Sequence, residues 1–125
     1  MNTKQKKRIS VYISKKTSDE IRQGMIKEDY KTNEKSKWVA EAILELLTLQ
    51  QNDIKKYEEI IKAGRVVRAF DKREEFYLSV ELDYKIEDSV ILLKKLDPTI
   101  EGGKSLIVRA SIVRRLLYPI KKNKS

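Results

Sequence analysis

Two stretches of the chain alternate strictly between apolar and polar residues, which is the pattern of a half-buried β-strand. The first covers residues 8–14 and the second covers residues 76–83. Their apolar positions are Ile9, Val11 and Ile13 in the first stretch, and Phe76, Leu78, Val80 and Leu82 in the second. Strands this short cannot bury a core alone, so we expect helices to cover their apolar sides.

Helical spacing of apolar residues follows each alternating stretch. After the first, the pattern predicts a helix over 18–30, with the Thr17 hydroxyl as its N-cap, and a second helix from Glu34 to at least Leu47. After the second, it predicts a helix over 86–96, a turn over 100–103, and a last helix that carries Ile107, Val108, Ile112, Leu116 and Leu117. Residues 48–74 read as a partly helical linker, and Trp38 is predicted to lie in the core.

The two halves match each other at a constant offset in residue number. The offset is 69 for Ile13 and Leu82, for Ser36 and Ser105, and for Val39 and Val108, with no gap between the matches. A gapless match that extends from a strand through two helices indicates an internal repeat of one structural unit.

Composition narrows the function classes. The 125 residues carry a formal net charge of +9, which favours a polyanionic partner. The chain has no cysteine and no histidine, so we expect no metal site, no cofactor and no enzymatic activity. Paired carboxylates such as Glu28-Asp29 are predicted to lie on solvated helix faces or in helix caps. No apolar run has membrane-spanning length, and we expect a cytoplasmic protein associated with the nucleoid or a plasmid.

The repeated strand, capped helix, polar turn and second helix resemble the ribbon-helix-helix family of DNA-binding proteins, written twice in one chain. The second helices carry the matching runs Ser36-x-x-Val39-x-x-Ala42-Ile43 and Ser105-x-x-Val108-x-x-Ser111-Ile112. The resemblance implies a mainly α fold with a two-stranded antiparallel β-ribbon. We divide the chain into a flexible basic arm (1–7), a first unit (8–47), the linker (48–74), a second unit (75–118) and a basic tail (119–125).

In that family the ribbon enters the DNA major groove, and the starts of the second helices bind phosphates. The resemblance therefore implies two sets of contact residues. The base-contacting set is Arg8, Ser10, Tyr12, Tyr77, Ser79 and Glu81. The phosphate-contacting set is Lys6, Asn33, Lys35, Ser36, Gly103, Lys104 and Ser105.

Charge complementarity indicates which strands pair. With Ser10 opposite Ser79, Arg8 would face Glu81, Lys6 would face Asp83, and Tyr12 would face Tyr77. Opposite charges directly across a ribbon stabilise it by about 0.2–1 kcal/mol each. This predicts that the two units pair within one chain as a pseudo-dimer. The alternative is that second units pair between chains and leave the first units to bind DNA.

We therefore expect a protein that binds double-stranded DNA with sequence preference and acts as a transcriptional repressor. An alternative is an accessory protein of plasmid conjugation, which would have a relaxase or another DNA-processing protein as its partner. A further alternative is a protein-interaction module without a DNA ligand, which the acidic second stretch favours. Self-association on adjacent DNA sites is an additional expectation, and no membrane partner is expected.

Overall fold

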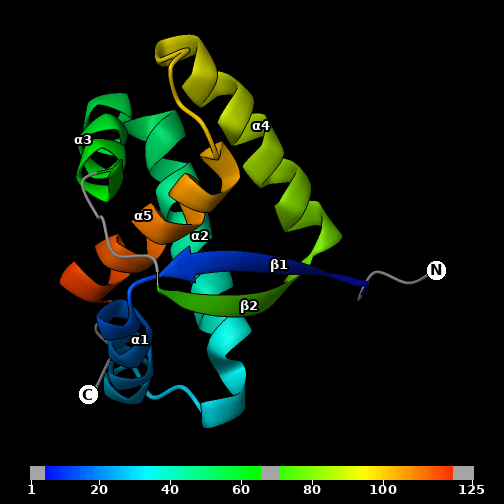
Figure 1. Cartoon of the computed structure of the whole chain (residues 1–125), viewed down its shortest axis with the longest axis vertical. Coiled ribbons are helices and arrows are strands. Elements are labelled where there is room, and N and C mark those ends of the chain that lie inside the picture. Colours follow the sequence, from blue (N-terminus) through cyan, green and yellow to red (C-terminus); the bar gives the residue numbers. More distant parts are fainter. Residues whose placement is uncertain (1–4, 66–70, 120–125) are drawn as a thin grey trace.

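A computed structural model describes residues 5–65 and 71–119 of the chain. Its elements are β1 (Lys6–Ile13), α1 (Lys15–Lys27), the short 3-10 helix η1 (Thr32–Glu34), α2 (Lys35–Asn52), α3 (Ile54–Arg65), β2 (Lys72–Ser79), α4 (Val80–Leu96) and α5 (Gly103–Leu117). The predicted arm and tail lie largely outside the described residues, as does part of the linker, residues 66–70. Each half thus has the order strand, helix, helix, and α3 lies between the halves (Figure 1).

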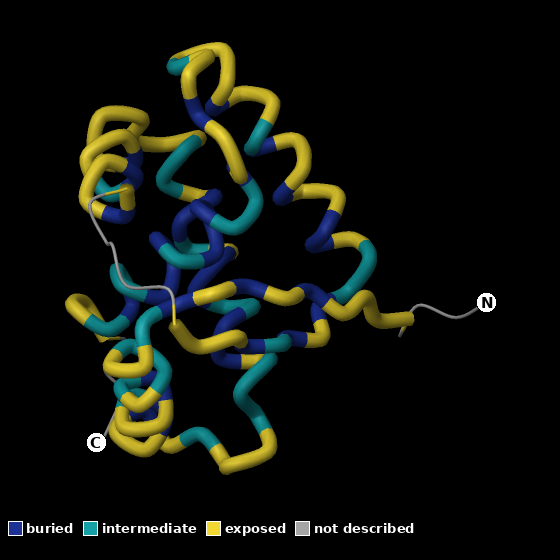
Figure 2. Tube along the Cα trace, in the orientation of Figure 1, coloured by how far each residue is buried: buried dark blue, intermediate teal, exposed yellow. Residues whose placement is uncertain are grey.

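The two strands pair with each other in one antiparallel ribbon within the chain (Figure 1). The fold is therefore mainly helical with a two-stranded ribbon, as the sequence predicted. Alternation divides the ribbon into two faces, and one of them is buried on the helices (Figure 2). The buried apolar residues are Ile9, Val11, Ile13, Phe76 and Leu78. Helix α2 packs against β2 and α5 against β1.

The predicted pairing register is wrong by four residues. Ser10 lies opposite Glu75 and not Ser79, and Arg8 lies opposite Tyr77 and not Glu81. The reason is that β2 ends at Ser79, and the last four residues of the predicted strand form the first turn of α4. In an amphipathic first turn, apolar and charged residues can alternate over a few positions just as they do in a strand.

Serine caps mark where each strand passes into a helix. The Oγ of Ser14 accepts a hydrogen bond from the Thr17 backbone N–H at 3.0 Å, and the Oγ of Ser79 accepts one from the Leu82 N–H at 3.0 Å. The predicted cap at Thr17 is therefore wrong, because the helix begins three residues earlier. The offset between Ser14 and Ser79 is 65, so strands and first helices repeat at 65 and not at 69.

The change of offset has a simple structural origin. Helix α4 has 17 residues and α1 has 13, which is about one additional helical turn in the second half. The second helices keep the offset of 69, as between Val39 and Val108. A shift of four residues preserves strand alternation and nearly preserves the helical period. For the strands and first helices, the apolar pattern therefore matches almost as well at an offset of 69 as at the observed offset of 65.

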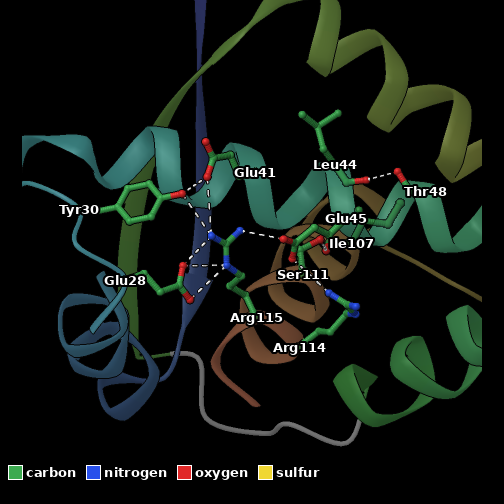
Figure 3. Close-up of polar contacts among 10 residues, drawn as sticks. All are labelled: Glu28, Tyr30, Glu41, Leu44, Glu45, Thr48, Ile107, Ser111, Arg114 and Arg115. Atoms are coloured by element: carbon green, nitrogen blue, oxygen red, sulfur yellow. Dashed lines mark hydrogen bonds and ion pairs between the residues drawn. The ribbon is translucent and has the colours of Figure 1, made fainter. Parts of the chain in front are cut away.

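Helices α2 and α5 pack together and join the two halves. Trp38, the one tryptophan, is fully buried there, as predicted. Beside it lies Arg115, whose side chain is 1% exposed. The Arg115 Nη2 donates to Glu28 Oε1 at 2.6 Å, and its Nη1 donates to Glu45 Oε2 at 3.2 Å (Figure 3). Glu28 is the C-cap residue of α1 and is buried, so of its two predicted placements the solvated face is wrong and the cap position is found.

Helix α3 packs against the α2–α5 pair and also contacts α4 through one buried polar contact. The hydroxyl groups of Tyr57 and Ser89 lie 3.2 Å apart in a hydrogen bond. Burial raises the pKa of the Tyr57 hydroxyl, and the contact with Ser89 opposes that effect. The helical part of the predicted linker is thus packed into the core.

Candidate nucleic-acid interface

The outward face of the ribbon is exposed and carries more cations than anions. Its residues are Lys6, Arg8, Ser10 and Tyr12 from β1, and Arg73, Glu75 and Tyr77 from β2. Tyr12 and Tyr77 are 54% and 50% exposed, so both rings are accessible at the surface. The face therefore offers guanidinium groups, hydroxyl groups and aromatic rings to an approaching molecule.

Cross-strand pairing places these side chains in three rows. Arg8 lies opposite Tyr77, Ser10 opposite Glu75, and Tyr12 opposite Arg73. The Nη2 of Arg73 donates to Ser10 Oγ at 3.0 Å and forms an ion pair with Glu75 Oε2 at 3.3 Å. In the described part of the chain, the guanidinium of Arg8 has no hydrogen-bond or ion-pair partner.

Four of these residues are related by the repeat. Arg8 and Arg73 are separated by the offset of 65, and so are Tyr12 and Tyr77. Because the strands run antiparallel, the two Arg–Tyr rows are related by a local near-two-fold axis through the ribbon centre. The central row breaks this symmetry, since Ser10 faces Glu75.

The start of α2 lies beside the outer edge of β2. The Oγ of Ser36 accepts a hydrogen bond from the Tyr77 backbone N–H at 2.9 Å. A shallow groove follows this edge and is lined by residues of both elements, among them Asn33, Lys35, Ser36, Arg73 and Tyr77. Three predicted phosphate contacts and one predicted base contact are thus gathered in one groove.

Lys35 is held by a carboxylate at the inner edge of that groove. Its Nζ lies 2.6 Å from Glu74 Oε1 and 5.6 Å from the centroid of the Phe76 ring. Burial pushes the pKa of Glu74 up, but hydrogen bonds from Lys35 and Ser18 outweigh this, and the net pKa lies below its usual range. The charge of Lys35 is therefore largely neutralised within the protein.

Lys104 at the start of α5 is held in a similar way. Its Nζ lies 2.6 Å from Asp83 Oδ1, and the Lys7 Nζ lies 3.0 Å from Asp83 Oδ2. Burial raises the pKa of Asp83, but the hydrogen bonds from Lys104 and Lys7 outweigh this effect and hold it below its usual range. The predicted pair of Lys6 with Asp83 is therefore wrong. Lys7, the next residue, contacts Asp83, and Lys6 lies opposite Ser79.

The N-terminal turn of α5 contains the other two predicted phosphate contacts, Gly103 and Ser105. The N-cap residue is Gly102, in the left-handed conformation (φ +59°), and no side chain caps the turn. A Cβ on Gly103 would lie 2.8 Å from Val90 Cγ1, so this glycine is required by packing against α4.

The other two predicted base contacts lie at or beyond the end of β2. Ser79 is the last residue of β2, opposite Lys6, and its hydroxyl caps α4. Glu81 is off the ribbon, exposed in the first turn of α4. Arg73 and Glu75 are outward residues of β2 that were not predicted, and Glu75 takes the position opposite Ser10 that the sequence assigned to Ser79. The signal that identifies them is the cap spacing: aligning Ser14 with Ser79 places Arg73 on Arg8.

A metal-binding group and a membrane-spanning helix are both absent from the described ranges. Residues 5–65 and 71–119 contain no group of three or more acidic side chains placed to hold a metal ion. Among the described helices, none combines the length and apolar character that crossing a bilayer requires. Comparison of the chain with protein families, with curated proteins and with solved structures found no match.

Proposed function

We propose that this protein binds double-stranded DNA with sequence preference by inserting the β1–β2 ribbon into the major groove. The observation that carries the proposal is the exposed outward face, with Arg8, Arg73, Tyr12 and Tyr77 on a ribbon whose other face is buried. The major groove of B-DNA admits a two-stranded ribbon, and an arginine there can donate two hydrogen bonds to a guanine.

The strand–helix–helix order in both halves supports a tandem ribbon-helix-helix arrangement, with the two units paired as a pseudo-dimer. On this reading the phosphate groups flanking the groove are contacted by Lys6, by Asn33 and by backbone N–H groups at the starts of α2 and α5. The ammonium groups of Lys35 and Lys104 contribute less, because Glu74 and Asp83 already bind them.

A ribbon bound over a promoter would exclude other proteins from the same groove. We therefore propose a transcriptional repressor as the biological role. The net charge of +9 supports binding to DNA whose affinity falls steeply as salt is added, because cations of the protein displace counterions from phosphates.

The proposal is tested by fluorescence anisotropy with labelled duplexes enriched from a random library. Arg8→Ala is expected to weaken binding to the enriched duplex by about 1–3 kcal/mol and to relax the preference at one base step. Lys62→Ala on α3 removes one exposed positive charge away from the ribbon, and it is the control.

Two results would contradict the proposal. The first is an Arg8→Ala protein that binds the enriched duplex and its single-base variants as the wild type does. The second is a wild-type protein that shows no salt-dependent affinity for any duplex, and this would favour a protein-interaction module instead.

A further inference from the structure

The outward face of the ribbon is nearly symmetric at its flanks and asymmetric at its centre. The sequences Arg8-x-Ser10-x-Tyr12 and Arg73-x-Glu75-x-Tyr77 occupy equivalent positions at the offset of 65. The antiparallel register places Ser10 and Glu75 directly opposite each other, at the local axis. The two triplets therefore differ only at their central residue, and this residue lies next to the local axis.

The central difference changes hydrogen-bonding chemistry. A serine hydroxyl can donate and accept, whereas an ionised glutamate can only accept. In the major groove the donors are the amino groups of cytosine and adenine, while guanine presents acceptors only. Glu75 therefore favours a cytosine or adenine amino group on its side of the axis. Ser10 can pair with either a donor or an acceptor on the other side.

The two arginines also differ in how they are held. Arg73 is fixed by Ser10 Oγ at 3.0 Å and by Glu75 Oε2 at 3.3 Å. Arg8 has no such partner in the part of the chain that the structure describes. An arginine whose side chain is already oriented loses less conformational entropy when it binds. The flank read by Arg73 is thus preorganised, and the flank read by Arg8 is not.

From these observations we infer that the protein recognises a single duplex element made of two related, inverted half-sites around a non-palindromic centre, and that it binds this element in one orientation. The inference rests on the proposed function. Arg8 and Arg73 read equivalent guanines in the two half-sites, and Glu75 sets the orientation through a base amino group at the centre. Replacing the central base pairs so that no base amino group lies against Glu75 in either orientation loses one specific contact and weakens binding by roughly 5- to 150-fold.

The test is selection of duplexes from a random library by the wild type and by Glu75→Ser. This variant gives both strands the same outward triplet, so its face becomes symmetric. The wild type is expected to enrich inverted half-sites around an asymmetric centre, and Glu75→Ser is expected to enrich the same half-sites around a palindromic centre. Glu58→Ser on α3 is the matched control, since it makes the same substitution at an exposed helix position away from the ribbon.

Circular dichroism spectra of both variants establish that they fold before selection. Enriched wild-type sites without related half-sites would overturn the inference while leaving sequence-specific binding intact. So would an unchanged asymmetric centre in the Glu75→Ser selection. If the wild type enriches no duplex, the proposed function itself fails, and the inference fails with it.

Discussion

Replacing Arg115 by leucine is the sharpest test of how the two halves are held together. The guanidinium is 1% exposed and contacts Glu28, Glu45 and the Tyr30 hydroxyl (Figure 3). Removing it leaves the Glu28 carboxylate, which is 2% exposed, without its cation. Leucine suits this position, because the equivalent residue of α2, at the offset of 69, is the fully buried Leu46.

The expected cost of Arg115→Leu is large. Breaking a buried ion pair from one side typically destabilises a protein by about 3–5 kcal/mol. Domains are stable by roughly 5–15 kcal/mol in total, so the variant should lose between about a fifth and nearly all of its stability. For a chain of this size the melting temperature should fall by about 10–25 °C. Glu45 contributes less to the loss, because Arg114 still contacts it at 3.1 Å.

Urea unfolding followed by far-UV circular dichroism measures this free energy of unfolding. Trp38 fluorescence is a second probe, since the Arg115 guanidinium lies 5.5 Å from the centroid of its ring. Arg22→Leu, at an exposed position of α1, is the control for removal of an arginine charge. The double variant Arg115→Leu/Glu28→Leu should regain part of the stability, because it removes the unpaired buried carboxylate. A single variant that loses less than about 1 kcal/mol, or a double variant less stable than the single one, would refute the reasoning.

Two further predictions concern the first turn of α4. Ser79→Ala should destabilise the protein by about 1 kcal/mol, because the Leu82 N–H loses its cap; an unchanged melting temperature would contradict this role. The pKa of Asp83 lies below its usual range, because Lys104 and Lys7 outweigh the effect of burial. The stability that this group contributes is therefore fully present above the unfolded pKa near 4 and is lost as pH falls through the folded pKa. Asp83→Asn should lower the free energy of unfolding at neutral pH and make its decline below about pH 4 shallower. Chemical denaturation across that pH range measures the decline. A decline as steep in the variant as in the wild type would show that the assignment is wrong.

Local patterning determined the elements of this protein and their order. The alternation of Ile9, Val11 and Ile13 with polar residues required one buried and one exposed face, and the structure has both. The helical spacing of Trp38, Val39 and Ile43 likewise placed α2 and its buried side. These features follow from the chain's own periodicity, so they need no knowledge of distant contacts.

Tertiary structure decided the register of the ribbon and the composition of its outward face, which the apolar pattern left open. A shift of four residues satisfies strand and helix periods almost equally, so apolar pattern could not separate an offset of 69 from one of 65. The Ser79 cap and the packing of one additional turn in α4 determine the offset of 65. As a result, Arg73 and Glu75 lie on the outward face and Glu81 lies on a helix. The buried pair of Arg115 and Glu28 joins positions far apart in the sequence and has no local signature, because only the folded chain brings the two charges together.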